Sequence, residues 1–238
     1  MAEGIRLVSE MKKEDLIGVY VSESWWRTHQ RLADKMEPAP EILSDCVFAH
    51  VSDTKTPQGI MGVVRRRVYG FADVTGETQK KQAHIVILSN LQDPGNVGTI
   101  FRTAEAAGVT GIILSRDCVD VYNPKVVRST MGAILRVPFY YTDDLPGEIK
   151  RIRKERIKVY AADLVDSRDY DQEDYIHGSA FLIGNEGNGL EREIADLADS
   201  RIRIPMQGEI ESLNAAVAAS ILMFEASRQR RGRKDLGD

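Results

Sequence analysis

The sequence contains few of the residues that build metal centres or disulfide frameworks. Only two cysteines, Cys46 and Cys118, and four histidines occur among the 238 residues, and they are scattered along the chain without a CxxC pair. Zinc sites and disulfide scaffolds both need such residues at close spacing. We therefore expect no metal, and we expect both thiols to be reduced and structural.

Long apolar runs and an excess of positive charge are also absent. No run approaches the roughly 18 apolar residues of a membrane-spanning helix, and the N-terminus lacks the pattern of a signal peptide. We expect a cytoplasmic protein without a membrane partner. A net charge of −4 weighs against a nucleic-acid binder, although basic residues cluster at Arg65–Arg67, at Lys80–Lys81 and within 228–234. Each cluster alone fits a solvated surface as well as a phosphate contact.

The first third of the chain has the pattern of a small α/β module. Apolar periodicity and β-branched residues predict two helices, Gly4–Met11 and Trp25–Met36, and three strands, Gly18–Ser22, Val47–His50 and Gly62–Arg67. The polar stretch FADVTGETQKKQ, residues 71–82, predicts a linker. We place this domain at 1–72 and the linker at 73–82. Because the chain opens directly on a predicted helix, we expect the module to be N-terminally incomplete.

Residues 83–238 form the second predicted domain, in which strand and helix signals alternate. Short apolar strands that alternate with longer helices predict an α/β fold with a mainly parallel sheet, covered on both faces. Ligands bind such sheets at the carboxyl ends of the strands. The predicted elements are strands 84–89, 111–114, 137–141, 159–163, 180–183 and 201–204, and helices 96–107, 124–135, 146–156, 190–198 and 212–229.

The last predicted helix is apolar on more than one side. Its stripe of Leu213, Val217, Ile221 and Phe224 is interleaved with alanines. Such a helix is more fully covered than an ordinary surface helix, either by its own domain or by a second subunit.

The first chemically informative segment is NLQDPGNVGTIFRTAEAAG, Asn90–Gly108. Gly95 and Gly98 flank Asn96 after a strand, so the backbone can turn tightly and amide groups at the helix start can face an anion. The segment is neither a Walker A loop nor GxGxxG. Arg102 lies on an otherwise apolar helix and needs a partner, either a ligand or a neighbouring acid in a structural ion pair.

Two further segments carry polar residues at strand ends. In FLIGNEGNGL, Phe181–Leu190, three glycines surround Glu186, which suits a ligand loop or a carboxylate at a helix start. In IPMQGEIESLNAAVAA, Ile204–Ala219, Ser212 could cap the last helix, whereas Asn214 just inside it is a poor helix former. Composition and spacing leave the reaction open.

These three segments, in this order and spacing, resemble motifs one, two and three of the SpoU/TrmH methyltransferases of the SPOUT superfamily. The resemblance covers about Ala83–Arg231 and includes VDVYNPKVVRSTMGAILRVP between motifs one and two. AEGIRLVSEM and FAHVSDTKTPQGIMGVV resemble the small α/β RNA-binding domain that many members carry first. The resemblance implies a C-terminal trefoil knot, an exception to the rule against knotted chains, and a homodimer.

The resemblance also implies a reaction: methyl transfer from S-adenosylmethionine to a ribose 2′-OH of ribosomal or transfer RNA. Arg102 would clamp a phosphate and stabilise the developing oxyanion, because guanidinium groups titrate above about pH 12 and are rarely bases. Motif three reads SLNAA here where SLNVS is common, which keeps both polar positions. The implied catalytic residues are Asn96, Arg102, Glu186, Ser212 and Asn214, and the implied donor contacts are Gly184, Ile204 and Leu213, with Met206 added by proximity. Separately from the resemblance, the basic cluster of Arg65, Arg66 and Arg67 in the first module is the candidate for RNA phosphate contacts.

Two other functions remain open from the sequence. A non-catalytic RNA-binding or assembly protein could use the same fold, and it would bind RNA without binding the donor. A methyltransferase could instead modify a base or a protein. Only a blocked 2′-OH protects the following phosphodiester from alkali, so alkali-resistant dinucleotides would distinguish ribose methylation from both.

Overall fold

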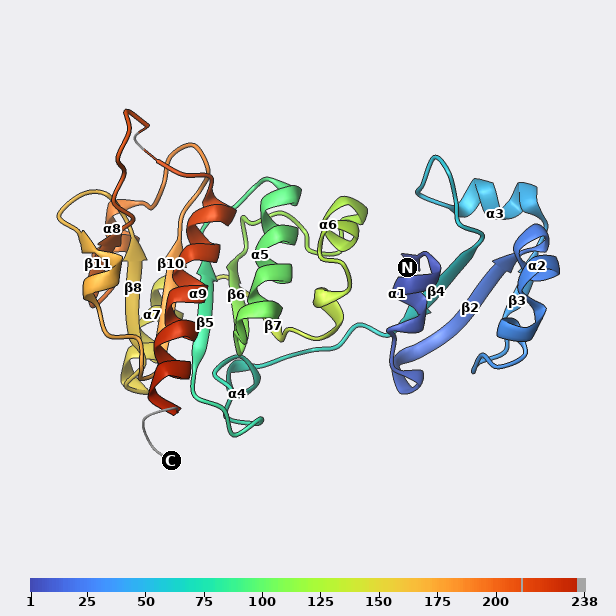
Figure 1. The fold of residues 1–238 in the computed structure, drawn as a ribbon, viewed down its shortest axis with the longest axis horizontal. Helices are drawn as coiled ribbons and strands as arrows, with labels where there is room; N and C mark the ends of the chain where they lie inside the picture. The colour runs from blue at the N-terminus through green and yellow to red at the C-terminus, as the bar shows by residue number, and fades with distance from the viewer. Residues whose placement is uncertain (211, 235–238) are drawn as a thin grey trace. The chain divides into compact units, whose positions relative to one another are not determined.

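The computed structural model describes residues 1–210 and 212–234 (Figure 1). The chain divides into two compact units, Met1–Val68 and Tyr69–Asp238. The second unit thus begins earlier than the sequence predicted and includes α4 (Phe71–Val74), part of the expected linker. Val74 is fully buried, and its carbonyl accepts a hydrogen bond from Thr110 Oγ1 at 2.7 Å. One buried valine in a stretch of mostly polar residues is too weak a signal to predict this helix.

The first unit is a small α/β fold around a four-stranded mixed sheet in the order β1-β4-β2-β3. Strand β2 pairs parallel to β3 and antiparallel to β4. Val19, Val21, Trp25 and Ile60 form the centre of its core. Its elements are β1 (Ala2–Glu3), α1 (Ile5–Ser9), the 3-10 turn η1 (Lys13–Asp15), β2 (Leu16–Ser22), α2 (Glu23–Ala33), β3 (Glu41–Leu43), α3 (Asp45–Val51) and β4 (Ile60–Val64).

The predicted strand Val47–His50 is wrong, because these residues lie in helix α3 (Asp45–Val51). Ser44 caps this helix by accepting the Val47 N–H at 3.3 Å. Only Phe48 is buried, whereas Val47 and Val51 are exposed. A good N-cap and one apolar contact therefore outweigh the strand propensity of the two valines.

The second unit contains a seven-stranded sheet in the order β7-β6-β5-β10-β8-β11-β9, and all its strand pairs are parallel. This confirms the predicted α/β fold with a parallel sheet. Its elements are α4, β5 (His84–Leu88), α5 (Pro94–Ala107), β6 (Gly111–Ser115), α6 (Pro124–Ser129), η2 (Ala133–Leu135), β7 (Phe139–Thr142), α7 (Leu145–Lys154), β8 (Lys158–Ala162), β9 (Arg168–Asp169), η3 (Tyr170–Gln172), β10 (Ser179–Ile183), α8 (Arg192–Ala195), β11 (Ser200–Arg203) and α9 (Ala215–Lys234).

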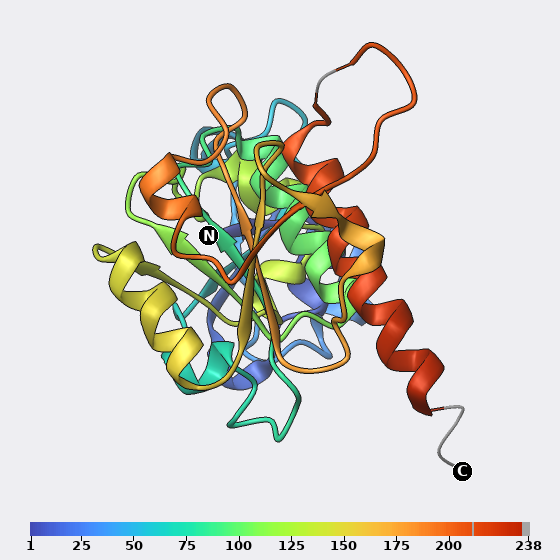
Figure 2. The same ribbon diagram turned by 90° about the vertical axis from the view of Figure 1, so that its left-hand side faces the viewer.

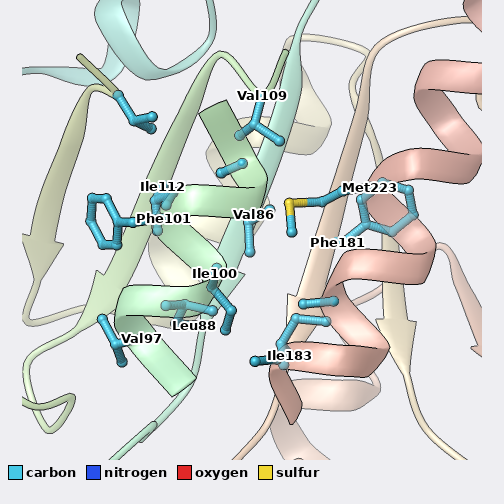
Figure 3. Close-up of a cluster of buried hydrophobic side chains, with 14 of the residues drawn as sticks. Val86, Leu88, Val97, Ile100, Phe101, Val109, Ile112, Phe181, Ile183 and Met223 are labelled. Atoms are coloured by element: carbon cyan, nitrogen blue, oxygen red, sulfur yellow. The ribbon is translucent and has the colours of Figure 1, made fainter. Parts of the chain in front are cut away.

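Helices cover both faces of this sheet, with α7 (yellow) and α9 (red) on opposite sides in Figure 2. Successive strand residues alternate between two cores: Val86 and Leu88 pack under α5 and α9, whereas Ile85 and Ile87 face α7. Figure 3 shows the first core, where Phe101 of α5 and Met223 of α9 reach toward the strands. Burial on both faces explains why the strands read as continuous apolar runs.

Two predicted helices are shorter in the structure. The helix predicted at 124–135 ends at Ser129, because Met131 and Gly132 adopt φ values of 50° and 88° before the 3-10 turn η2. The helix predicted at 190–198 is only α8, Arg192–Ala195. None of the described helices is both long enough and apolar enough to cross a membrane.

Helix α9 begins at Ala215, three residues later than predicted, and two residues of its apolar stripe are exposed. Ala216, Ala219, Leu222, Met223 and Ala226 face the core, while Val217 and Phe224 are 46% and 44% exposed. Alanines face inward because α9 packs side by side with α5, where Ser220 Oγ donates to Thr103 Oγ1 at 3.2 Å. Two of its larger apolar residues, Val217 and Phe224, are therefore left on its outer face.

Strands β5 and β10 lie next to each other although about 95 residues separate them. The chain leaves β5 toward β6 on one side, and it leaves β10 toward β11 on the other. Neighbouring strands whose connections diverge mark the switch point where open α/β sheets bind ligands.

Candidate active site

The carboxyl ends of β5 and β10 bring the three informative segments together. Strand β5 runs into the loop before α5, which contains Asn96 in its first turn. Strand β10 runs into the glycine loop that carries Glu186. The third segment follows β11 and enters α9 next to α5. The polar residues that the sequence placed on three separate elements therefore share one edge of the sheet.

Asn214, Asn96 and Glu186 form a hydrogen-bonded relay across this edge. Asn214 Nδ2 donates to Asn96 Oδ1 at 2.9 Å, and Asn96 Nδ2 donates to Glu186 Oε1 at 3.1 Å. The direction is fixed from both ends. Asn214 Oδ1 accepts the backbone N–H groups of Ala216 and Val217, and the carboxylate can only accept. Both amides consequently have one possible orientation.

The Glu186 carboxylate is held by several donors at the start of α5. The backbone N–H groups of Gln92 and Asp93 donate to it at 3.2 and 2.9 Å, in addition to Asn96 Nδ2. Partial burial would raise the pKa of Glu186, but these hydrogen bonds outweigh it and hold the pKa below 4.5. Glu186 therefore stays ionised near neutral pH and acts as an acceptor that orients Asn96.

The anion expected at the start of α5 is thus supplied by the protein itself. Glu186 is therefore a helix-start carboxylate, but it lies at the start of α5 and not at the start of α8, the helix that follows it in the sequence. The role expected for Gly98 also changes. Gly98 lies inside α5 against α6, where a Cβ atom would come within 1.8 Å of Ser129 Oγ, so it permits close helix packing.

Asn214, and not Ser212, caps the last helix. Its Oδ1 accepts the N–H of Ala216 at 2.9 Å and of Val217 at 3.3 Å, and its carbonyl accepts the N–H of Ala218. Asn is a favoured N-cap residue, which removes the objection to Asn in an alanine-rich helix. Asn214 therefore does two jobs, capping α9 and donating to Asn96, while Ser212 is exposed beside it.

The glycine loop after β10 folds tightly back on itself. Asn185 and Gly189 exchange two backbone hydrogen bonds of 2.9 Å, and Gly189 adopts φ 68°. A Cβ atom at Gly184 would lie only 2.3 to 2.5 Å from the backbone of Gly189 and Leu190. Gly184 is therefore required by the loop's own backbone, whatever it contributes to a ligand.

A cavity of about 530 Å³ opens beside this loop. Its volume is in the range of small-molecule sites, and backbone of the glycine loop and apolar side chains of α9 both line it. All four expected donor contacts line it, as do Glu186 and Ser212, whereas Asn96, Arg102 and Asn214 do not. S-adenosylmethionine, with a flat adenine and polar ends, suits such a lining. The four contacts are Gly184, Ile204, Met206 and Leu213.

Sequence reasoning missed two parts of the cavity wall. Ala162–Val165 follows β8, and its place at a strand end was the available signal. Arg192 and Arg201 also line the cavity, but nothing in the sequence distinguished them from other surface arginines. Within residues 1–210 and 212–234, no three His, Cys, Asp or Glu side chains gather as metal ligands.

Arg102 does not join the relay within its own chain. It is exposed on α5, and its guanidinium makes no hydrogen bond or ion pair with any residue that the structure describes. The alternative of a structural ion pair for Arg102 is therefore not found among the described residues. Glu105, the nearby acid, pairs instead with Arg136, whose Nη2 donates to Glu105 Oε2 at 2.9 Å.

The three arginines expected to contact RNA differ from one another. Arg65 and Arg66 are exposed in the first unit. Arg67 Nε donates to Asp15 Oδ2 at 2.8 Å, and its Nη2 also contacts Asp15 and Glu14. Arg67 therefore has a structural role.

Comparison with known proteins gives the family. Residues 83–224 match the model of the SpoU rRNA Methylase family. The chain is 32% identical to the 23S rRNA (guanosine(2553)-2′-O)-methyltransferase RlmP of Bacillus subtilis over 226 residues, which covers 94% of this chain and 86% of that protein.

Solved structures match nearly the whole chain. The AdoMet-bound rRNA methyltransferase of Sinorhizobium meliloti superposes with a TM-score of 0.78 at 31% identity, covering 95% of this chain and 86% of that one. The SpoU methyltransferase AviRb of Streptomyces viridochromogenes, in complex with AdoMet, gives 0.82 at 26% identity, covering 97% and 90%. With the family model spanning more than half of the sequence, the chain belongs to the SpoU rRNA methylase family of RNA methyltransferases.

Proposed function

We propose that this protein transfers a methyl group from S-adenosylmethionine to the ribose 2′-OH of a nucleotide in structured ribosomal or transfer RNA. The observation that carries the proposal is the relay of Asn214, Asn96 and Glu186, which meets the rim of the cavity at Glu186. RlmP, which its name describes as a 2′-O-methyltransferase, supports the choice of the ribose.

The donor is proposed to occupy the cavity beside the glycine loop. When bound, S-adenosylmethionine supplies an electrophilic methyl group. Gly184, Ile204, Met206 and Leu213 would surround it, chiefly through backbone groups and apolar contacts. The late strand β10 lies between the earlier strands β5 and β8, an arrangement that suits a threaded C-terminal region. We therefore keep the trefoil knot as part of the proposal.

The relay is proposed to position the ribose rather than to remove its proton. Glu186 is saturated with donors and has a lowered pKa, so it is a weak base. Asn96 and Asn214, each fixed in one orientation, retain further hydrogen-bonding capacity for sugar hydroxyls. Holding the 2′-oxygen in line with the methyl group lowers the barrier mainly through orientation. Ser212, on the cavity wall, would contact the ribose from the donor side.

Arg102 is proposed to act across a homodimer interface. It lies six residues after Asn96, which places it about 240° around α5 and about 9 Å farther along its axis. Arg102 shares the outer side of α5 and α9 with exposed Val217 and Phe224, an apolar surface that a second copy would cover. Arg102 of one subunit would then clamp a target phosphate at the site of the other.

The first unit is proposed to select the RNA. Arg65 and Arg66 are its candidate phosphate contacts, because both are exposed beyond the end of β4. Their replacement by alanine should weaken RNA binding without changing the affinity for the donor.

The proposal is tested by incubating the full-length protein with methyl-labelled S-adenosylmethionine and unmodified ribosomal and transfer RNA transcripts. We expect the wild-type protein to incorporate label into one of these RNAs, and we expect Asn96→Ala to incorporate none. Incorporation that is unchanged in Asn96→Ala would exclude the relay from the reaction. RNA binding with no incorporation and no donor binding would favour a non-catalytic protein.

A further inference from the structure

One positively charged side chain on the cavity wall has no partner among the described residues. Five charged side chains line it: Asp163, Glu186, Arg192, Arg201 and Arg203. Arg201 pairs with Asp163 at 3.7 Å and also contacts Asp196, and Arg203 Nε lies 2.8 Å from Asp169 Oδ1. Glu186 is held by its donors. Arg192 alone makes no hydrogen bond or ion pair with any residue of the described chain.

The side chain of Arg192 has no stabilising polar interaction with its own helix. Arg192 is the first residue of α8, and the acid one helical turn later is Asp196. That carboxylate would be its ordinary partner, but it contacts Arg201 instead. A cation at a helix start also gains nothing from the peptide dipoles. The guanidinium is thus left on the cavity wall with its donors available.

The shape of the donor assigns a ligand group to this position. Three arms meet at the sulfonium of S-adenosylmethionine: the methyl group, the adenosyl group and an amino acid arm that ends in a carboxylate. The methyl group must face the rim at Glu186, and the adenine is best accommodated among apolar Ile183, Ile202 and Leu222. The amino acid arm then remains near the segment that runs from Glu186 to Arg192.

We propose that Arg192 binds the α-carboxylate of the methyl donor and makes the cavity selective for ligands that retain this group. The inference rests on the donor cavity proposed above. A planar guanidinium can hold a carboxylate with two parallel hydrogen bonds, a geometry that lysine cannot reproduce. The carboxylate would complete the charge balance of the cavity, in which every other charged side chain already has a partner.

The test compares two ligands by calorimetry on the full-length protein: S-adenosylhomocysteine and its decarboxylated analogue, which keeps the amine. We expect the wild-type protein to bind S-adenosylhomocysteine more tightly. Arg192→Gln should weaken that binding about tenfold and leave the affinity for the analogue unchanged, because only the first ligand offers a carboxylate. Arg192→Lys should recover part of the loss. Since Arg192 is exposed, these variants should unfold at the wild-type temperature.

Arg203→Gln is the matched control, because Arg203 lines the same cavity but is paired with Asp169. It should leave the ratio of the two affinities unchanged. Equal weakening of both ligands in Arg192→Gln, or no weakening of either, would overturn the assignment. Failure of the wild-type protein to bind either ligand would instead overturn the donor cavity itself, and with it the proposed function.

Discussion

Asn214→Asp separates the two roles of Asn214, because it replaces only the side-chain NH2 group by an oxygen. The aspartate keeps the side-chain oxygen that caps α9, so the hydrogen bonds from Ala216 and Val217 should persist. It loses the Nδ2 donor, and two acceptor oxygens would face each other across the 2.9 Å that now separates Asn214 from Asn96. If Asn96 turned its amide over to donate to the new carboxylate, its Oδ1 would face the Glu186 carboxylate at 3.1 Å instead. No orientation of Asn96 satisfies both neighbours.

The size of the effect follows from this conflict. Asn214 is exposed, so water can satisfy these groups in the free protein and the conflict should cost little stability there. Once bound RNA excludes water, an unsatisfied hydrogen-bonding group costs about 1 to 3 kcal/mol, which corresponds to a loss of about 5- to 150-fold in kcat if the relay serves only to orient the ribose. The affinity for the donor should not change, because Asn214 does not line the cavity. The melting temperature should also stay close to that of the wild-type protein. Asn214→Ala is the control, and it should lose about 1 kcal/mol of stability with the helix cap.

Single-turnover methylation and thermal unfolding of both variants test whether Asn214 serves the relay separately from its role as helix cap. Wild-type turnover by Asn214→Asp would refute the relay. A loss of stability in Asn214→Asp as large as that in Asn214→Ala would refute the separation of capping from catalysis.

Three other predictions follow from the same geometry. The pKa of Glu186 is lowered in the folded protein, so ionised Glu186 stabilises the fold fully above its ordinary pKa of 4.5, and this stabilisation is lost as the pH falls through the folded pKa. The difference in melting temperature between wild type and Glu186→Gln should therefore be constant above about pH 5 and narrow below it. A difference that widens in acid would contradict this. Gly98→Ala should destabilise the protein by about 1 to 3 kcal/mol in denaturant unfolding, since the added Cβ would overlap Ser129, and Ser129→Gly should recover part of the loss; additive effects of the two changes would argue against the contact. Mixing inactive Arg102→Ala with inactive Asn96→Ala should restore about a quarter of wild-type activity if Arg102 acts in the partner's site, because half of the randomly formed dimers would then hold one intact site. Mixed dimers that stay inactive would place Arg102 in its own subunit's site.

The sequence predicts the architecture of the second unit well because its signals are local and repeated. Apolar strands such as His84–Leu88 are buried on both faces, so they appear as uninterrupted runs that no single tertiary contact can override. The order of the strands in the sheet, in contrast, cannot be predicted from local signals. That β10 lies between β5 and β8 depends on contacts between distant segments, and composition does not encode it.

The errors have local physical causes. Val47 and Val51 favour a strand, but the cap at Ser44 and the buried Phe48 make that segment helical. The apolar pattern of α9 predicts a helix covered on more than one side, but Val217 and Phe224 are exposed, because the close approach of α5 favours alanines at the contact. In both cases a specific neighbour decides the outcome over residue propensity.

The candidate site was only partly accessible from the sequence. Asn96 and Glu186 could be singled out because they lie among glycines that follow strands, and Asn214 because Asn is a poor helix former in an alanine-rich helix. Their hydrogen-bonding order, the cap formed by Asn214 and the occupation of the α5 start by Glu186 depend on distances between three loops. Arg192 gave no sequence signal at all, since its significance lies in the pairing of every other charge around it.

The most direct test of the central claim is the chemical position of the transferred methyl group. RNA methylated by the wild-type protein with labelled S-adenosylmethionine is hydrolysed in alkali, and the products are separated. Ribose methylation predicts that the label appears in an alkali-resistant dinucleotide. Label recovered in mononucleotides would place the methyl group on a base and contradict the account.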